Sequence, residues 1–209
     1  MPLFKNRDER YTLARNLILI LRELPVELDL QVDNYGYASI PNLLAKLTAT
    51  YPDITIDHIM EIAQKDAQKR FEISGGKIRA KTGHRYYVKL PSDTVKPPEF
   101  LYHGTSGEAA MEILKTGILK MGKAYVHLTN TPERARRIGF RKSSNPKILK
   151  VHAKKAFDAN IQFWKSGQVA PDGEIYLSNE IPPGFVSCTN ENVSKEQAER
   201  SPRNNQRKR

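Results

Sequence analysis

Hydrophobic residues in the first part of the chain recur at helical spacing. Leu13, Leu17 and Leu21 lie four residues apart, so they form one stripe along a helix. Asp8 and Glu9 precede this stripe, where the positive end of a helix favours acidic side chains. A proline shortly after the stripe predicts the end of the helix.

Two further helices are predicted after the first, each beginning at a hydroxyl-bearing residue. The stretch "GYASIPNLLAKL" predicts a short strand and then a helix with Ser39 as its cap and Pro41 in its first turn. The stretch "TIDHIMEIAQKDA" predicts a helix capped by Thr55. His58 lies between apolar positions of that helix, and a packed or surface position is a simpler interpretation than a ligand-binding one.

The periodicity then changes from helical to alternating, which predicts a β-hairpin. Phe71 and Ile73 alternate on one strand, Ile78 and Ala80 alternate on the other, and a Gly-Gly pair fills the turn. Helices followed by a basic hairpin resemble a winged-helix domain. Residues 91–100 are rich in proline and polar side chains, so they predict a linker.

Short strands and helices alternate beyond this linker. The stretches "EFLYH", "AYVHL" and "KILKVHA" predict strands, while "GEAAMEILKTG" and "TPERARRIGF" predict helices, the first of which ends at Gly117. The stretch "FWKSGQVAPDGEIYLS" predicts a hairpin with a long, turn-rich loop. We therefore expect an α+β fold with domains at residues 1–92 and 93–188, followed by a basic disordered tail at 189–209.

Charge adds an indication of the partner. Lys and Arg number 34 against 23 Asp and Glu, a formal net charge of +11 that favours polyanions such as nucleic acid. Residues 195–209 hold six basic and two acidic side chains, and residues 69–89 hold seven basic and one acidic. The second cluster contains the predicted hairpin and is the sharper signal, because a basic tail can serve solubility alone.

Composition also excludes several classes of protein. The single cysteine, Cys188, excludes an internal disulfide and a thiolate metal site. The N-terminus is too charged for a signal peptide, and no apolar run is long enough to span a bilayer. We expect a soluble, cytoplasmic and monomeric protein without membrane contact.

The stretch "LYHGTSG" at residues 101–107 is a candidate site. It lacks the G-x-S-x-G elbow of a serine nucleophile, and the five histidines form no H-x-x-x-H pair that would indicate a metal. Ser106 could simply cap the following helix. A ligand pocket uses more of the stretch, because Gly104 permits close approach, His103 and the hydroxyls can hold ribose and phosphate, and a helix N-terminus favours anions.

Seven segments together resemble the RNA 2′-phosphotransferase family. They run in the family's order and spacing from about residue 10 to 187, namely "LILILRELP", "YASIPNLL", "GGKIRAKTGH", "YHGT", "YVHLT", "RRIGFR" and "NEIPPGFV". The resemblance implies a winged-helix lobe joined to an ADP-ribosyltransferase-like lobe with two small, mostly antiparallel sheets.

The same resemblance implies NAD-dependent removal of an internal 2′-phosphate from a tRNA-like RNA, of the kind left at a splice junction. The 2′-phosphate would attack the anomeric carbon of the nicotinamide ribose, and a neighbouring ribose hydroxyl would then attack the phosphorus. The products would be 2′-hydroxyl RNA, nicotinamide and ADP-ribose 1″,2″-cyclic phosphate. NAD is a co-substrate in this scheme, and no metal is expected.

The family pattern also implies roles for individual residues. Guanidinium groups suit phosphate chemistry because they stay charged and offer paired donors, and the implied catalytic arginines are Arg22, Arg79 and Arg141. Each arginine has a structural alternative when taken alone, as a helix-end, strand-surface or capping side chain. The implied NAD-binding residues are His103, Gly104, Thr105, Ser106 and His127. The implied contacts to substrate phosphate are His84 and Arg85.

Three positions depart from the family pattern. The family usually has a histidine after the arginine of the first helix, and Glu23 stands there in this chain. A carboxylate at that position would repel a phosphate or pair with an arginine. Arg85 replaces the usual serine and would partly compensate, and "KSSN" follows Arg141 where the family favours a His-Gly-like pair.

These departures keep two alternatives open. One is an ADP-ribosyltransferase that acts on RNA phosphate ends and has a weak second step. The other is a non-catalytic winged-helix protein that binds RNA and not NAD.

Overall fold

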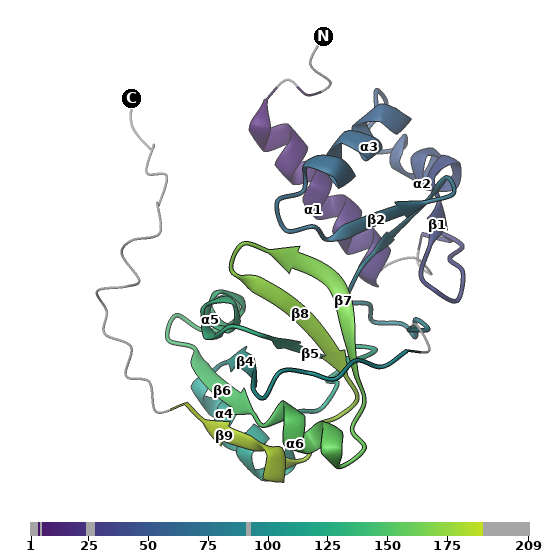
Figure 1. Cartoon of the computed structure of the whole chain (residues 1–209). Helices are drawn as coiled ribbons and strands as arrows, with labels where there is room; N and C mark the ends of the chain where they lie inside the picture. Colours follow the sequence, from purple (N-terminus) through teal and green to yellow (C-terminus); the bar gives the residue numbers. More distant parts are fainter. Residues whose placement is uncertain (1–3, 5, 24–27, 91–92, 190–209) are drawn as a thin grey trace, which may run out of the picture.

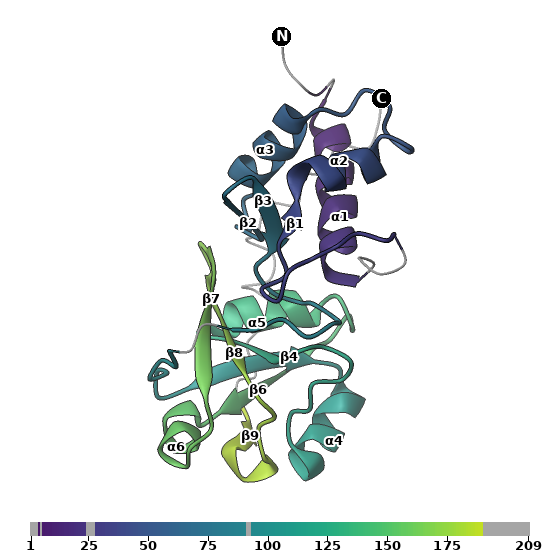
Figure 2. The same cartoon turned by 90° about the vertical axis from the view of Figure 1, so that its right-hand side faces the viewer.

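The structure is a computed structural model that describes residue 4 and residues 6–23, 28–90 and 93–189. The described elements gather into two bodies that lie one above the other (Figures 1 and 2). We call residues 4–90 the first lobe and residues 93–189 the second lobe. The predicted disordered tail lies outside the described residues, apart from its first residue.

Three helices pack against a small antiparallel sheet in the first lobe. The sheet has the order β1-β3-β2. The predicted hydrophobic stripe of the first helix is confirmed, because Leu13 is 5% exposed and Leu17 and Leu21 are fully buried. The helices and strands are α1 (Arg7–Glu23), β1 (Ala38–Ser39), α2 (Ile40–Leu47), α3 (Ile56–Lys65), β2 (Phe71–Ser74) and β3 (Lys77–Ala80).

Local chemistry at the element ends largely matches the predictions. Thr55 stands at the N-cap of α3, where its backbone N–H donates to Nδ1 of His58 over 3.2 Å, so His58 supports a helix start. Ser39 stands at the N-cap of α2, but its side chain makes no capping hydrogen bond. The predicted hairpin turn is confirmed, since Gly75 and Gly76 have φ values of 54° and 73° that favour glycine.

The second lobe contains a six-stranded antiparallel sheet in the order β7-β8-β5-β4-β6-β9. The expectation of two separate sheets in this lobe is therefore wrong. The halves β7-β8-β5 and β4-β6-β9 meet at the register pair of Tyr102 with Thr129, which joins them into one sheet. The strands are β4 (Leu101–Thr105), β5 (Val126–Thr129), β6 (Lys147–Val151), β7 (Phe163–Ala170), β8 (Gly173–Ser178) and β9 (Val186–Cys188).

Helices flank this sheet, namely α4 (Gly107–Thr116), α5 (Pro132–Gly139), α6 (Ala153–Asp158) and the 3₁₀ turn η1 (Pro183–Phe185). The predictions of α4 and α5 are confirmed, whereas α6 and η1 were not predicted, and the strand predicted from "KILKVHA" ends before α6 begins at Ala153. Gly117 ends α4 with a φ of 89°, as the sequence predicts. In Figure 1 α5 lies on the side of the sheet that faces the first lobe.

The β7–β8 hairpin differs from its prediction. Its turn is short, because Ala170 pairs with Gly173. The irregular part lies inside β7, where residues 166–168 stand opposite Ile175 alone. The Ser-Gly pair that resembled a loop therefore forms a bulge, in which Gly167 takes a φ of 70°.

Each lobe has its own cluster of buried hydrophobic side chains. Leu17 and Ile78 belong to the cluster of the first lobe, and Leu101 and Leu149 belong to the cluster of the second. Residues 93–100 contain no helix or strand, in agreement with the predicted linker. The exact domain boundaries and the winged-helix and ADP-ribosyltransferase-like assignments stay predictions. Among the described residues, no helix combines the length and apolar character needed to cross a membrane.

Candidate functional site

A pocket opens where the two lobes meet. The first lobe contributes Arg79, Lys81 and His84 to its lining, and the second contributes His127 and Lys165. Hydrophobic side chains complete the lining of the pocket, among them those of Val88, Leu90, Tyr125 and Leu177. Cations and imidazoles on apolar walls suit an anionic ligand that also carries a ring.

Three nitrogen atoms beside this pocket are buried and lack a hydrogen-bond partner among the described residues. They are Nε of Arg22, Nε2 of His84 and Nε2 of His127. Buried polar groups nearly always have partners, so a cluster of unpartnered ones indicates where a ligand supplies them. These groups are neighbours, because the charge of Arg22 acts on the pKa of both histidines.

Arg22 reaches the site from the last turn of α1. Its guanidinium lies against Gly83, where an added Cβ would come within 3.0 Å of Nε and crowd the side chain. Gly83 also takes a φ of 90°, which favours glycine. Nη2 of Arg22 donates to the hydroxyl of Thr82 over 3.5 Å. Burial, together with the charges of Arg70 and Arg141, lowers the pKa of Arg22 to about 10, so the side chain remains cationic at neutral pH.

Both pocket histidines are neutral at neutral pH. Burial and the charges of Arg22 and Arg79 lower the pKa of His84 to about 3. Burial and the charge of Arg22 lower the pKa of His127 to about 4. Each ring then offers one donor and one acceptor, which suits contact with a hydroxyl or a phosphate oxygen.

Arg79 is held in place by several partners. Its Nη2 lies 2.7 Å from Oε2 of Glu72, and its Nη1 donates to the carbonyl oxygen of Tyr35 over 3.0 Å. The guanidinium also lies over the ring of Tyr37, 4.6 Å from the ring centre. This predicted catalytic residue is therefore fixed in the pocket wall before any ligand binds.

Arg141 lies just beyond α5 and is exposed. Its charge contributes to the lowered pKa of Arg22, so the two guanidinium groups are near enough to repel each other. Of the three arginines that the family pattern implies, Arg79 alone lines the pocket, and their catalytic roles stay predictions.

Glu23 is paired with cations from both lobes. Its carboxylate lies 3.5 Å from Nε of Arg85 and 3.3 Å from Nζ of Lys123. Lys123 also donates to the carbonyl oxygen of Gly83 over 3.2 Å. The expected pairing of Glu23 with a cation is therefore seen, and it uses Lys123, which the sequence did not single out, as well as Arg85.

Residues of the "HGTS" stretch take part in packing and helix capping. A Cβ on Gly104 would lie 1.8 Å from the carbonyl oxygen of Ala135, so glycine lets α5 pack on β4. Ser106 caps α4 by accepting the N–H of Ala109 over 3.3 Å. Thr105 is 1% exposed. None of these residues lines the pocket, and their NAD-binding roles stay predictions.

His103 connects this stretch to the pocket. Its Nδ1 lies 3.1 Å from the carbonyl oxygen of His127. Burial lowers the pKa of His103, so its ring is neutral and Nδ1 acts as the donor in this contact. The two histidines implied for NAD binding are therefore neighbours on adjacent strands.

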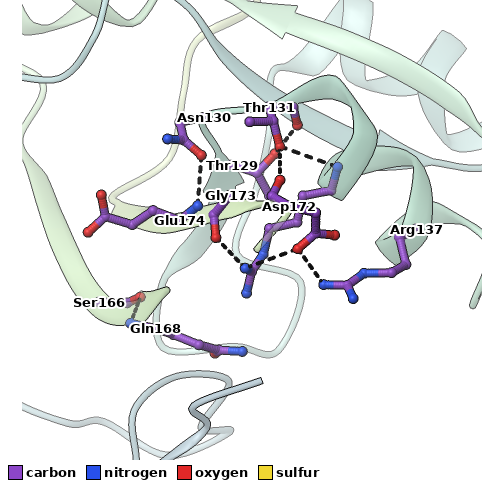
Figure 3. Close-up of polar contacts among 10 residues, drawn as sticks. Thr129, Asn130, Thr131, Arg137, Ser166, Gln168, Asp172, Gly173 and Glu174 are labelled. Carbon is purple, nitrogen blue, oxygen red and sulfur yellow. Dashed lines mark hydrogen bonds and ion pairs between the residues drawn. The ribbon is translucent and has the colours of Figure 1, made fainter. Parts of the chain in front are cut away.

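No local sequence pattern indicated a second buried arginine, Arg134. Arg134 is 2% exposed, donates to the carbonyl oxygen of Gly173 and lies 3.5 Å from Asp172. Arg137 pairs with the same carboxylate over 2.7 Å (Figure 3). These contacts tie α5 to the β7–β8 turn, and no local pattern reveals them because the partners lie far apart in sequence.

The described residues contain no group of three or more His, Cys, Asp or Glu side chains arranged to hold a metal ion. The donors that converge on the pocket are instead guanidinium, ammonium and imidazole groups.

Comparison with known proteins identifies the family. Residues 8–170 match the family described as "RNA 2'-phosphotransferase, Tpt1 / KptA family". The chain belongs to this family. The resemblance found in its short motifs is therefore confirmed.

Three relatives in bacteria and archaea align over 80% or more of their length. A probable RNA 2′-phosphotransferase of Bacillus thuringiensis is 32% identical over 185 residues, which is 87% of this chain and 97% of the relative. One of Pyrococcus furiosus is 35% identical over 184 residues, which is 88% of this chain and 96% of the relative. One of Archaeoglobus fulgidus is 34% identical over 180 residues, which is 86% of this chain and 80% of the relative.

Proposed function

We propose that this protein is an NAD-dependent transferase that removes an internal 2′-phosphate from RNA. The observation that carries the proposal is the convergence of three unpartnered buried nitrogens, from Arg22, His84 and His127, beside a cationic pocket in a chain of this family. The products would be 2′-hydroxyl RNA, nicotinamide and ADP-ribose 1″,2″-cyclic phosphate. The substrate would be a tRNA-like RNA that carries the phosphate.

Arg22, Arg79 and Arg141 would bind and orient the 2′-phosphate and stabilise charge on its oxygens. Arg22 is suited to this role because its Nε–H is buried and unpartnered, so a phosphate oxygen would satisfy it. Arg79 is pre-positioned by Glu72 and Tyr35, which limits the reorganisation needed during reaction. No general base is required to create the nucleophile, since a phosphate monoester is already ionised at neutral pH.

NAD would bind at the junction of the two lobes. Its phosphates would be complementary to Lys81 of the first lobe and Lys165 of the second, and its ribose hydroxyls would suit the unpartnered Nε2 of neutral His127. Bound NAD would supply the electrophilic ribose carbon and nicotinamide as the leaving group. His103 would hold His127 in place by donating a hydrogen bond from Nδ1 to the backbone carbonyl oxygen of His127.

A second candidate function is ADP-ribosylation of RNA phosphate ends without efficient release of the cyclic phosphate. The observation that favours it is Glu23, a carboxylate in the α1 turn that carries Arg22. Its negative charge would oppose charge build-up on phosphate in the second step. Its ion pairs with Arg85 and Lys123 offset that charge, which favours the complete reaction.

The decisive experiment is a product analysis. The purified chain is incubated with NAD and an RNA that bears one internal 2′-phosphate, with the same RNA lacking the phosphate as control. We expect dephosphorylated RNA and ADP-ribose 1″,2″-cyclic phosphate only from the phosphorylated RNA. Accumulation of ADP-ribosylated RNA would support the second candidate, and RNA binding without any NAD consumption would overturn both.

A further inference from the structure

A side chain from the second lobe reaches the phosphate-binding region of the first. The side-chain oxygen of Gln168 accepts a hydrogen bond from the hydroxyl of Thr82 over 2.9 Å. Both residues are buried, with exposures of 6% for Gln168 and 4% for Thr82. The hydroxyl of Thr82 is in turn the acceptor for Nη2 of Arg22. A continuous polar chain therefore runs from Gln168 through Thr82 to Arg22.

The bulge in β7 makes this contact available. Residues 166–168 oppose Ile175 alone, so the regular alternation of side chains is interrupted at Gln168. The hydroxyl of Ser166 accepts the backbone N–H of Gln168 over 3.0 Å (Figure 3). Nζ of Lys81 donates a hydrogen bond to the carbonyl oxygen of Gly167 over 2.9 Å, which gives the bulge a second contact with the first lobe.

The direction of the Thr82 hydroxyl matters for Arg22. A hydroxyl has one proton and two acceptor lone pairs, whereas a guanidinium can only donate. When the Thr82 proton points at Gln168, the lone pairs remain available to Nη2 of Arg22. Without Gln168 the hydroxyl is free to rotate, and a proton turned toward Arg22 would repel the guanidinium.

We propose that Gln168 is a positioning residue for Arg22 and acts through Thr82 across the lobe junction. The inference rests on the proposed function, in which Arg22 binds the 2′-phosphate. Nη2 is then held by Thr82, and Nε, a buried donor without a partner among the described residues, is left to bind the phosphate. Gln168 would thus couple the placement of the second lobe to the phosphate affinity of the first.

The test measures how well the protein distinguishes phosphorylated from unphosphorylated RNA. The dissociation constants of two matched oligonucleotides, with and without one internal 2′-phosphate, are compared for each variant. Gln168→Met keeps the length of the side chain and removes the acceptor, and Thr82→Val keeps its shape and removes the hydroxyl. We expect each to lower the discrimination ratio by about tenfold, the effect of one hydrogen bond to a charged group.

Three controls separate positioning from damage to the fold. Gln162→Ala removes an exposed glutamine just before β7 and should leave the ratio unchanged. Thr82→Ser retains the hydroxyl and should retain most of the ratio. The double variant Gln168→Met/Thr82→Val should be no worse than Thr82→Val, because both changes break one chain.

A purely structural role predicts a different result. Gln168→Met and Thr82→Val would then lower the active fraction or melting temperature and leave the discrimination ratio as in the unmodified protein, which would overturn the inference. Failure of the proposed function shows itself separately, because the unmodified protein would then not distinguish the two RNAs at all.

Discussion

Neutral imidazoles beside a buried guanidinium define the site at the scale of single residues. Burial keeps His84 and His127 uncharged although they stand in a cationic region, so the positive charge there comes from arginine and lysine. This division suits a phosphate ligand, because fixed cations bind it while neutral rings contact hydroxyls. Three predictions belong to this scale.

The first concerns stability against pH. The pKa of His84 is about 3 in the folded chain, below the value of roughly 6.5 for an unfolded histidine, so only the unfolded state gains a proton between these values. Stability should therefore fall as the pH drops below about 6.5, and His84 alone should contribute roughly 2 kcal/mol of loss between pH 7 and pH 5. His84→Asn should reduce that loss in urea unfolding, and an unchanged pH dependence would contradict the burial argument.

The second concerns Glu23. Replacing it by histidine removes a negative charge and releases Arg85 and Lys123 toward the phosphate. Glu23→His should preserve or raise the rate of the second step, measured as release of cyclic phosphate from ADP-ribosylated RNA in single-turnover experiments. Glu23→Gln separates loss of charge from gain of an imidazole. A large fall in that rate for Glu23→His would show that Glu23 has an adapted role.

The third concerns Arg79, which is fixed by Glu72 and Tyr35 in the pocket wall. Arg79→Ala should lower turnover by about 100-fold or more, as expected for loss of a pre-positioned charge donor. NAD affinity, measured by calorimetry, should fall much less, and Arg79→Lys should recover part of the turnover. Equal losses in turnover and NAD affinity would contradict the assignment to phosphate.

At the scale of elements, hydrophobic periodicity and capping residues predicted most of the fold. The stripe of α1, the hairpin of β2 and β3 and the end of α4 at Gly117 all follow from local patterns. The β7 bulge and the continuous six-stranded sheet could not be predicted, because they depend on pairing between distant strands. A Ser-Gly pair is typical of turns, and only the register with β8 shows that it lies within a strand.

The packing of α5 on β4 gives a prediction at this scale. Gly104→Ala would place a Cβ 1.8 Å from the backbone of Ala135, so the helix must shift. We expect a loss of about 2–3 kcal/mol in unfolding free energy, measured by chemical denaturation. Gly107→Ala is the matched control, since nothing lies within 4 Å of an added Cβ there. Equal stability of the two variants would contradict the observed packing.

At the scale of the whole molecule, the site exists because two lobes meet. The backbone N–H of Ala124 donates to the carbonyl oxygen of His84 over 3.0 Å. The hydroxyl of Tyr125 donates to the carbonyl oxygen of Val88 over 3.1 Å. The sequence assigned arginines from both lobes to one reaction through family resemblance. Local patterns could not identify the residues that hold the lobes together, because Lys123 and Gln168 bind Glu23 and Thr82, which lie about a hundred positions away in the sequence.

The central claim is that this junction transfers a 2′-phosphate from RNA by consuming NAD. The most direct test is the stoichiometry of nicotinamide released against 2′-hydroxyl RNA formed, using an RNA with one internal 2′-phosphate. The account predicts one nicotinamide for each phosphate removed, and none with the unphosphorylated RNA. Loss of the phosphate without nicotinamide release, or nicotinamide release with the RNA unchanged, would contradict it.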